Sequence, residues 1–220
     1  MLCLIQSRLT SKRLPNKSLI KINKKEILLR VIDQIKKCKK VKKIYVLIPD
    51  TISNKKIEIF LKKKKINFFK GNENNVFDRF YYFLSNKKKF KSFIRISADS
   101  PLIDPNIISK SISLYNKNKN YDLITNVFPR TFPKGQSVEI VNSNSFLNLK
   151  YKKLTKYHKE HVTSYFYDYH KKFKIKNLLN FKNQNKFDLS VDTKKDLVKI
   201  SRIINSLEEK GKKISLENIC

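Results

Sequence analysis

The chain has 220 residues, of which 40% are hydrophobic, and it carries a formal net charge of +32. This length and apolar content suit a single domain, which we expect to span residues 1–220. No stretch reaches the roughly 18 consecutive apolar residues of a membrane span, and the first residues lack the features of a signal peptide, so we expect a cytoplasmic protein without membrane insertion. The three cysteines (Cys3, Cys38 and Cys220) lack CxxC spacing, and we expect reduced thiols.

The positive charge comes almost entirely from lysine, because only seven of the 50 basic residues are arginine. The chain is also rich in Asn, Ile, Phe and Tyr, whose codons are A/T-rich, so base composition explains the lysine excess. Lysine runs at 62–65 and 87–89 lie at expected helix ends and turns, where solvated lysine is usual, and we expect no specific nucleic-acid partner. The surviving arginines should mark sites that need a planar guanidinium: Arg8, Arg13, Arg30, Arg79, Arg95, Arg130 and Arg202.

Extended and helical patterns alternate along the chain. Apolar runs predict strands at 2–5, 43–49, 66–70, 92–97, 121–127, 137–141 and 173–179. Amphipathic patterns predict helices at 24–38, 53–64, 75–86, 104–117, 158–170 and 192–210, the last opened by a capping box of Thr193 and Asp196. This alternation predicts an α/β domain with a mostly parallel sheet and helices on both faces, in which ligands bind at the C-terminal ends of the strands.

The first strand opens into a loop with several cations, in the segment LCLIQSRLTSKRLPNK. The segment contains no glycine, so neither glycine-rich phosphate loop is available, and an anion here must be held by side chains. The guanidinium groups of Arg8 and Arg13, the ammonium of Lys17 and the hydroxyl of Ser11 could together hold a di- or triphosphate. The alternative is an exposed basic loop in a lysine-rich protein.

Acidic residues are scarce, and two of them follow strand-like runs. Asp99 comes after the run at 92–97, and Asp192 comes after Leu189–Val191. Carboxylates at strand ends beside a polyphosphate loop are natural ligands for Mg²⁺, and we predict that Asp99 and Asp192 hold it. Asp104 precedes Pro105 and is better explained as a helix N-cap.

Two further segments contain candidate binding residues. In GNENNVFDRF, Asp78 and Arg79 could face a nucleobase or form a surface ion pair. In FPRTFPKGQSVEI, a loop with proline and glycine carries Arg130 and Glu139, which suit a second substrate.

A third segment, YHKEHVTSYF, carries Glu160 and His161. These two side chains either order the pocket of the second substrate or only pack. His158 and His170 are predicted to be surface residues.

Taken in order, these segments resemble the cytidylyltransferase-like family of the spore-coat polysaccharide biosynthesis protein F type, homologues of CMP-KDO synthetase. The resemblance rests on IQSRLTSKRLPNK, GNENNVFDRF, RISADSPLIDP, YDLITNVFPRTFPKGQSVEI, KEHVT and LSVDTKKDL, and covers residues 2–205. It implies a Rossmann-like three-layer α/β/α sandwich of the nucleotide-diphospho-sugar transferase type, with a mostly parallel mixed sheet. Family members of known activity join a sugar acid to CTP, release pyrophosphate and act in surface polysaccharide or glycan pathways.

Carried over by position, the resemblance implies that Arg8, Ser11, Arg13 and Lys17 hold the triphosphate and that Asp99 and Asp192 bind Mg²⁺. We expect Arg13 and Lys17 to be catalytic as well, and Gln6 and Arg79 to bind the nucleotide with them. The residues expected to bind the second substrate are Arg130, Gly135, Glu139 and His161. The resemblance alone suggests a homodimer.

Four positions depart from the family pattern: Asn16 stands for Gly, Ala98 for a frequent Gly, and Gln136-Ser137 for an apolar residue followed by Asp. Asn accepts the left-handed backbone that Gly supplies, so we expect position 16 to tolerate it. Three rival interpretations remain: a glycosyltransferase of similar fold, a basic nucleic-acid-binding protein, and a homologue that has lost its activity. Glycosyltransferases of this kind usually show a DxD pair, and none follows an apolar strand in this chain.

Overall fold

The computed structural model describes residues 1–87 and 89–219, so Lys88 of the run at 87–89 and the predicted thiol of Cys220 lie outside the described residues. The strands are β1 (Leu2–Gln6), β2 (Lys21–Ile22), β3 (Lys25–Glu26), β4 (Lys43–Pro49), β5 (Phe68–Gly71), β6 (Ser92–Ser97), β7 (Leu123–Thr125), β8 (Glu139–Asn142) and β9 (Ile175–Asn177). The α-helices are α1 (Ile27–Lys37), α2 (Lys55–Lys63), α3 (Val76–Ser85), α4 (Pro105–Lys117), α5 (Ser143–Leu147), α6 (Lys156–Glu160), α7 (Ser164–Asp168), α8 (Lys194–Glu209) and α9 (Leu216–Ile219). Short 3-10 helices lie at Lys17–Leu19 (η1), Ile52–Asn54 (η2), Asn148–Tyr151 (η3) and His170–Lys172 (η4).

The described residues form a seven-stranded sheet in the order β5-β4-β1-β6-β8-β7-β9. Strands β5, β4, β1 and β6 pair in parallel, β8 pairs antiparallel with β6 and β7, and β9 is parallel to β7. This is the predicted mostly parallel mixed sheet of a Rossmann-like α/β fold.

Helices cover both faces of the sheet because apolar side chains alternate along the central strands. On β1, Cys3 and Ile5 pack with buried residues of α1, α2 and α4, whereas Leu2 and Leu4 pack with those of α3, α5 and α7. Five of the six apolar side chains of α1 are buried, namely Ile27, Leu28, Val31, Ile32 and Ile35, and Leu29 is partly exposed.

The central strands β1 and β6 end level with each other, and β4 continues two residues further. Gln6, the last residue of β1, pairs with Leu47 of β4 and Ser97 of β6. The loops that follow β1 and β6 therefore leave the sheet at the same edge, as the fold rule for ligand sites predicts.

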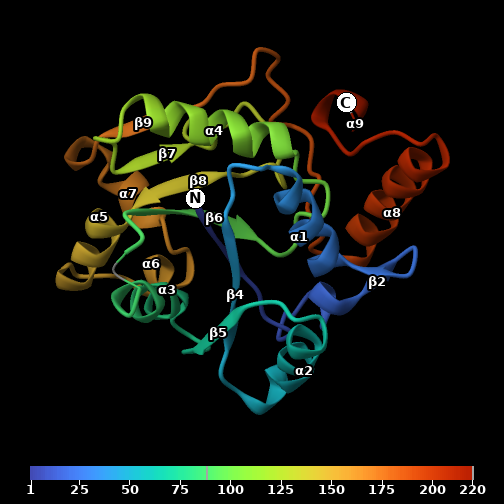
Figure 1. The fold of residues 1–220 in the computed structure, drawn as a ribbon, viewed down its shortest axis with the longest axis horizontal. Helices are drawn as coiled ribbons and strands as arrows, with labels where there is room; N and C mark the ends of the chain where they lie inside the picture. The colour runs from blue at the N-terminus through green and yellow to red at the C-terminus, as the bar shows by residue number, and fades with distance from the viewer. Residues whose placement is uncertain (88, 220) are drawn as a thin grey trace.

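A third apolar cluster lies beside this edge. Ile200, Ile204 and Leu207 of α8 pack with residues that include Leu14 of the opening loop and Val191. In Figure 1, α8 and α9 lie at the right-hand side of the molecule beside α1 and β2, whereas α3, α5 and α6 lie together on the left. The predicted capping box of Thr193 and Asp196 opens α8.

The helix predicted over 158–170 is wrong as a continuous element, because the chain forms α6 and α7 with a break between them. At the break, Val162 is buried and the Thr163 hydroxyl donates to Glu139 Oε1 at 2.8 Å, so tertiary contacts replace the helix. The surface assignment of His158 is also wrong. Its ring is buried, accepts a hydrogen bond from the Thr155 amide and pairs with Asp168 at 2.8 Å.

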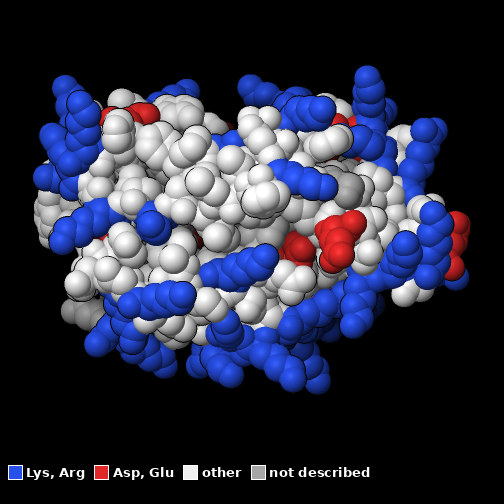
Figure 2. Space-filling model, turned by 90° about the horizontal axis from the view of Figure 1, so that it is seen from above, with Lys and Arg blue, Asp and Glu red and all other residues white. Residues whose placement is uncertain are grey.

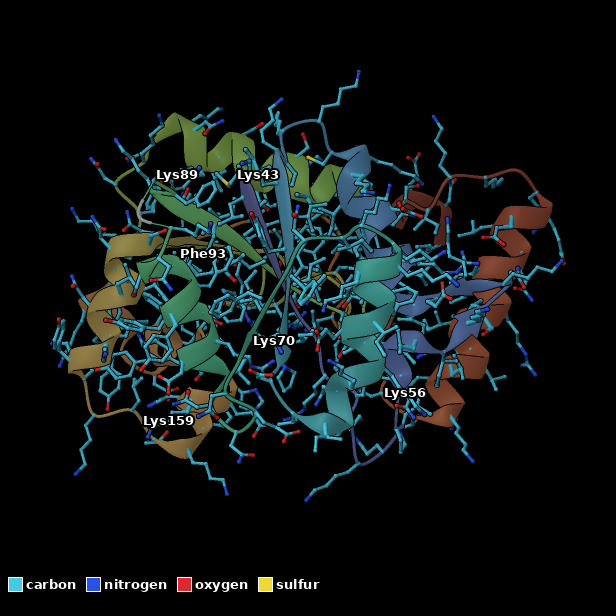
Figure 3. All side chains as sticks on the ribbon, turned by 60° about the horizontal axis from the view of Figure 1, so that its bottom comes forward. Lys43, Lys56, Lys70, Lys89, Phe93 and Lys159 are labelled. Atoms are coloured by element: carbon cyan, nitrogen blue, oxygen red, sulfur yellow. The ribbon has the colours of Figure 1, made fainter. Side chains whose placement is uncertain are left out.

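Basic side chains are spread over the molecule. Figure 2 shows Lys and Arg around the whole outline of one face, with a few acidic side chains among them. The lysines labelled in Figure 3 belong to separate elements, including Lys43 of β4, Lys56 of α2 and Lys159 of α6, while Phe93 is buried in the core. This distribution is what a solvated lysine-rich surface predicts.

Two further expectations concern membranes and thiols. No helix in the described ranges 1–87 and 89–219 is long and apolar enough to cross a bilayer. Cys3 and Cys38 are free and buried, and burial raises the pKa of the Cys3 thiol.

Gln136 ties two loops of the site edge together. Its side chain is fully buried, accepts a hydrogen bond from the Asp104 amide at 2.9 Å and donates to the Leu102 carbonyl at 2.6 Å. The backbone carbonyl of Gln136 also accepts from the Asn126 side chain at 2.7 Å. The loop that follows Asp99 is thus held against the loop that precedes β8.

We predict that Gln136→Leu lowers the free energy of unfolding by about 2–4 kcal/mol, because two buried backbone groups lose their partners. Urea denaturation measures the change. The matched control is Gln184→Leu, which loses only a partly exposed contact with Asn180. Equal stabilities of the two variants would show that the Gln136 amide does not hold the loops.

Candidate active site

A backbone hydrogen bond closes the opening loop just before Lys17. The Asn16 amide donates to the Leu9 carbonyl at 2.9 Å, and Leu9 and Leu14 are buried. Asn16 has φ 57°, so the expectation that Asn tolerates a left-handed backbone at this position is confirmed. Lys17 then begins η1 with its side chain directed back over the sheet edge.

Lys17 brings the two predicted metal carboxylates together. Its Nζ lies 2.9 Å from Asp99 Oδ2, 2.9 Å from Asp192 Oδ1 and 3.1 Å from the Val191 carbonyl. Burial alone would lower the pKa of Lys17, but the charges and hydrogen bonds of Asp99 and Asp192 outweigh it, and the pKa is raised. The ammonium therefore stays charged between the carboxylates.

Asp192 is contacted by three cations. Lys17 binds one carboxylate oxygen, while Arg13 Nη2 at 3.2 Å and Lys134 Nζ at 3.0 Å reach the other. Burial would raise the pKa of Asp192, but the hydrogen bonds and charges of Lys17 and then Lys134 lower it to about 2. The carboxylate is therefore ionised at any physiological pH.

Backbone pairing explains why residues so distant in sequence meet. Asp99 follows β6, and its carbonyl accepts a hydrogen bond from the Val191 amide at 2.9 Å. Leu189 and Val191 are buried against α8, which anchors the segment that carries Asp192. The end of β6 and the start of α8 are thus fixed side by side.

The donor set of this cluster fits a hard divalent cation. One oxygen of Asp99 and one of Asp192 lie 2.9 Å from the Lys17 nitrogen, so they are no more than about twice that distance apart. Carboxylate oxygens are the ligands that Mg²⁺ prefers, and it completes its shell with water and substrate phosphates. The Lys17 ammonium here takes the place that a cation would have between the two carboxylates.

The other residues predicted to bind the nucleotide lie around the same sheet edge. Arg8, which is half exposed, pairs with Glu160 of α6 at 3.0 Å, and Gln6 Oε1 accepts from Arg95 Nε at 3.0 Å. Ser11 is partly exposed, and its hydroxyl has no protein partner among the described residues.

Arg79 is the largest fully buried side chain, at 1% exposure. Its Nη1 makes only long contacts with the Ser7 and Leu47 carbonyls at 3.5 and 3.4 Å, and its Nε has no partner within the described chain. Burial, together with the charge of Arg8, lowers the pKa of Arg79 to about 10. A surface ion pair of Arg79 is therefore wrong.

Gly71 makes room for Arg79. A Cβ at Gly71 would lie 2.8 Å from Arg79 Cγ. The glycine of GNENNVFDRF thus allows the guanidinium to lie beneath the ends of β1 and β4.

A pocket of about 190 Å³ lies next to Arg95. It contains several residues predicted to bind the second substrate, and Tyr157 and His161 form part of its wall with ring centroids 4.4 Å apart. The lining residues are Arg95, Val127, Arg130, Ser137, Glu139, Tyr157, His161, Thr163, Ser164 and Tyr167.

Both carboxylate oxygens of Glu139 are engaged by neighbouring side chains in this pocket. It is the register partner of Arg95 across the β6/β8 pair, and the two side chains form an ion pair. The hydroxyl groups of Thr163 and Tyr167 donate to its other oxygen. Its negative charge is thus already compensated within the protein.

Unlike Arg95, Arg130 forms no ion pair with any residue in the described part of the chain. Both of its Nη atoms donate to Ser137 Oγ at 3.2 Å, and one lies 3.5 Å from the Pro133 carbonyl. Burial lowers the pKa of Arg130. The pocket thus offers one guanidinium without a counterion.

Gly135 shapes this loop rather than lining the pocket. It has φ +88°, and a Cβ would lie 2.5 Å from the Leu189 carbonyl carbon. Glycine is required here because the loop and the 187–189 segment run in close contact.

The predicted site residues therefore form two groups at one sheet edge. Arg13, Lys17, Asp99 and Asp192 form the first, and Arg130, Glu139 and His161 line the pocket of the second. Arg95 was marked as one of the seven arginines, but the sequence reasoning gave it no role in the site. Lys134, Asp188 and Tyr167 were also missed, and Lys134 gave no signal because lysine is the background of this chain.

Residues 2–217 match the family described as Cytidylyltransferase. An uncharacterized protein of Methanocaldococcus jannaschii is 32% identical over 198 residues, covering 88% of this chain and 78% of that protein. The spore coat polysaccharide biosynthesis protein SpsF of Bacillus subtilis is 25% identical over 218 residues, covering 95% of this chain and 88% of that protein.

Solved structures share the fold. A cytidylyltransferase from Leptospira borgpetersenii has a TM-score of 0.88 at 27% identity, covering 93% of this chain and 86% of that one. A CMP:2-keto-3-deoxy-manno-octonic acid synthetase complexed with CTP has a TM-score of 0.74 at 13% identity, covering 93% and 98%. The cation and carboxylate cluster at the sheet edge and the family match agree: the chain belongs to the cytidylyltransferase family and is a CTP-using nucleotidyltransferase.

Proposed function

We propose that this enzyme transfers the CMP group of CTP to a hydroxyl of a sugar acid and releases pyrophosphate, with Mg²⁺ held by Asp99 and Asp192. The observation that carries the proposal is that Lys17 contacts both carboxylates and Arg13 contacts Asp192. The acceptor oxygen would form a bond to the α-phosphorus as the bond to the pyrophosphate oxygen breaks, and the hydroxyl proton would leave to solvent.

The protein contributes by positioning and charge neutralisation. Arg13 and Lys17 lie where a triphosphate bound at the carboxylates would extend, and they offset the charge that builds on the departing pyrophosphate. Bound Mg²⁺ supplies Lewis-acid polarisation of a phosphoryl oxygen. Asp99 and Asp192 are the residues that would hold it.

The acceptor pocket supports a substrate with a negative charge. Arg95 and Glu139 neutralise each other, so the charge left in the pocket is that of Arg130. Guanidinium groups bind carboxylates in a bidentate manner. A sugar acid offers both the carboxylate for Arg130 and the hydroxyl groups that the polar wall can bind.

The names of similar proteins also support a role in the synthesis of CMP-linked sugars. The SpsF protein of Bacillus subtilis bears a name that places it in spore coat polysaccharide biosynthesis, and the synthetase of similar fold is named for a CMP-linked sugar acid. We propose a surface polysaccharide or glycan pathway for this enzyme, in the cytoplasm, where CTP is available. The single domain and the homodimer stay predictions.

The direct test is incubation of the enzyme with Mg²⁺, each of the four nucleoside triphosphates and a panel of 2-keto sugar acids. Pyrophosphate release with CTP and a sugar acid, and not with either alone, is the expected result. Release with a different nucleotide only, or hydrolysis of a ready-made CMP-sugar instead, would contradict the proposal.

We predict that Asp99→Asn lowers the rate of pyrophosphate release with Mg²⁺ on the order of a thousandfold, because the charge of one metal ligand is lost. The matched control is Asp50→Asn, which removes an exposed carboxylate that pairs with Lys70 at 2.9 Å. Near-full activity of Asp99→Asn with Mg²⁺ would show that the metal assignment is wrong.

The free charge of Arg130 generates another prediction. Ser137→Asp places a counterion beside Arg130, so the KM for the sugar acid should rise about tenfold, the effect of losing one charge-assisted hydrogen bond. The KM for CTP should not change. Ser137→Asn, which has nearly the same shape without charge, is the control, and equal effects of the two variants on the KM for the acceptor would contradict the role of Arg130.

A further inference from the structure

Lys134 is a third cation at the metal carboxylates, and nothing in the sequence pattern singled it out. Its Nζ lies 3.0 Å from Asp188 Oδ2 and 3.0 Å from Asp192 Oδ2. The same Asp192 oxygen is contacted by Arg13 Nη2 at 3.2 Å. The Lys134 side chain is 49% exposed, whereas that of Lys17 is 15% exposed, so Lys134 lies on the open side of the cluster.

The backbone of Lys134 is held by hydrogen bonds, whereas its side chain is half exposed. The Lys134 amide donates to the Phe187 carbonyl at 2.9 Å, and the Lys134 carbonyl accepts from the Leu189 amide at 2.8 Å. The close approach of Gly135 to Leu189 holds the same contact. The ammonium group can therefore change its position only by rotation about the bonds of the lysine side chain.

The charges of the cluster balance as the structure stands. Arg13, Lys17 and Lys134 supply three positive charges, and the acidic groups that pair with them are Asp99, Asp188 and Asp192. A divalent cation on two of these carboxylates would displace ammonium groups from them and leave an excess of positive charge. Three cations gathered at one site without matching carboxylates would attract an anion, and the triphosphate of CTP supplies one.

We infer that Lys134 is a further triphosphate-binding residue: its ammonium rests on Asp188 and Asp192 in the free enzyme and moves to a phosphate oxygen of CTP when the nucleotide enters with its divalent cation. This inference rests on the proposed role of Asp99 and Asp192 as metal ligands. Because Lys134 lies on the same loop as Arg130, the residue also links the nucleotide to the acceptor pocket.

The inference predicts that Lys134→Gln weakens the binding of CTP but strengthens the binding of a divalent cation. Affinity for CTP with Mg²⁺, measured by isothermal titration calorimetry without acceptor, should fall about tenfold, because one charge-assisted hydrogen bond to phosphate is lost. Binding of Mn²⁺ to the nucleotide-free enzyme, measured by electron paramagnetic resonance, should strengthen several-fold, because a competing ammonium leaves Asp192.

Lys186→Gln is the matched control, since Lys186 lies on the neighbouring segment over the Phe187 ring, and it should change neither binding constant. Lys134→Arg keeps the charge and should retain most of the CTP affinity. Circular dichroism melting checks that Lys134→Gln is as stable as the wild type.

Two results would overturn the inference: unchanged CTP affinity in Lys134→Gln, or parallel weakening of both CTP and Mn²⁺ binding, which indicates a structural role. Failure of the proposed metal site is seen separately, as Mn²⁺ binding that Asp99→Asn does not weaken. In that case, a loss of CTP affinity confined to Lys134→Gln would still support the phosphate contact.

Discussion

The ion pairs on Asp192 are the interaction on which the site depends. They join the opening loop, through Arg13 and Lys17, to the loop before β8, through Lys134. Partly buried charges are stable only with partners, so removal of one member leaves the others uncompensated. In the proposed reaction, a divalent cation and a polyphosphate would together replace the partners that the side chains supply to one another in the free enzyme.

The reversed strand β8 decides what the neighbouring pocket can bind. Antiparallel pairing with β6 places Glu139 directly opposite Arg95. Because the two side chains form an ion pair, neither charge is left to bind a ligand in the pocket. Thr163 reaches the same carboxylate because the chain breaks between α6 and α7. Ser137, two residues before β8, leaves Arg130 without a counterion. The proposed preference of the pocket for a negatively charged acceptor thus depends on strand direction and register.

Composition limited how much of the site could be predicted. Arginine is rare in this chain, so Arg8, Arg13 and Arg130 stood out, and the structure places all three at the sheet edge or in the pocket. Lysine is so abundant that Lys134 could not be distinguished from the solvated surface. The three-residue strands β7 and β9 were predicted too long, because pairing with neighbouring strands sets their length and local apolar pattern does not.

The sequence by itself determined the α/β alternation, the caps at Asp104 and Thr193, and the cationic loop after β1, because each depends on residues close together in the chain. Only the tertiary structure decided that Asp99 and Asp192 share one ammonium, that Glu139 is neutralised and that Arg79 is buried without a counterion. These facts depend on distances between segments that the sheet order and the docking of α8 bring together. Such distances are set by packing of the whole core, and no local pattern of residues encodes them.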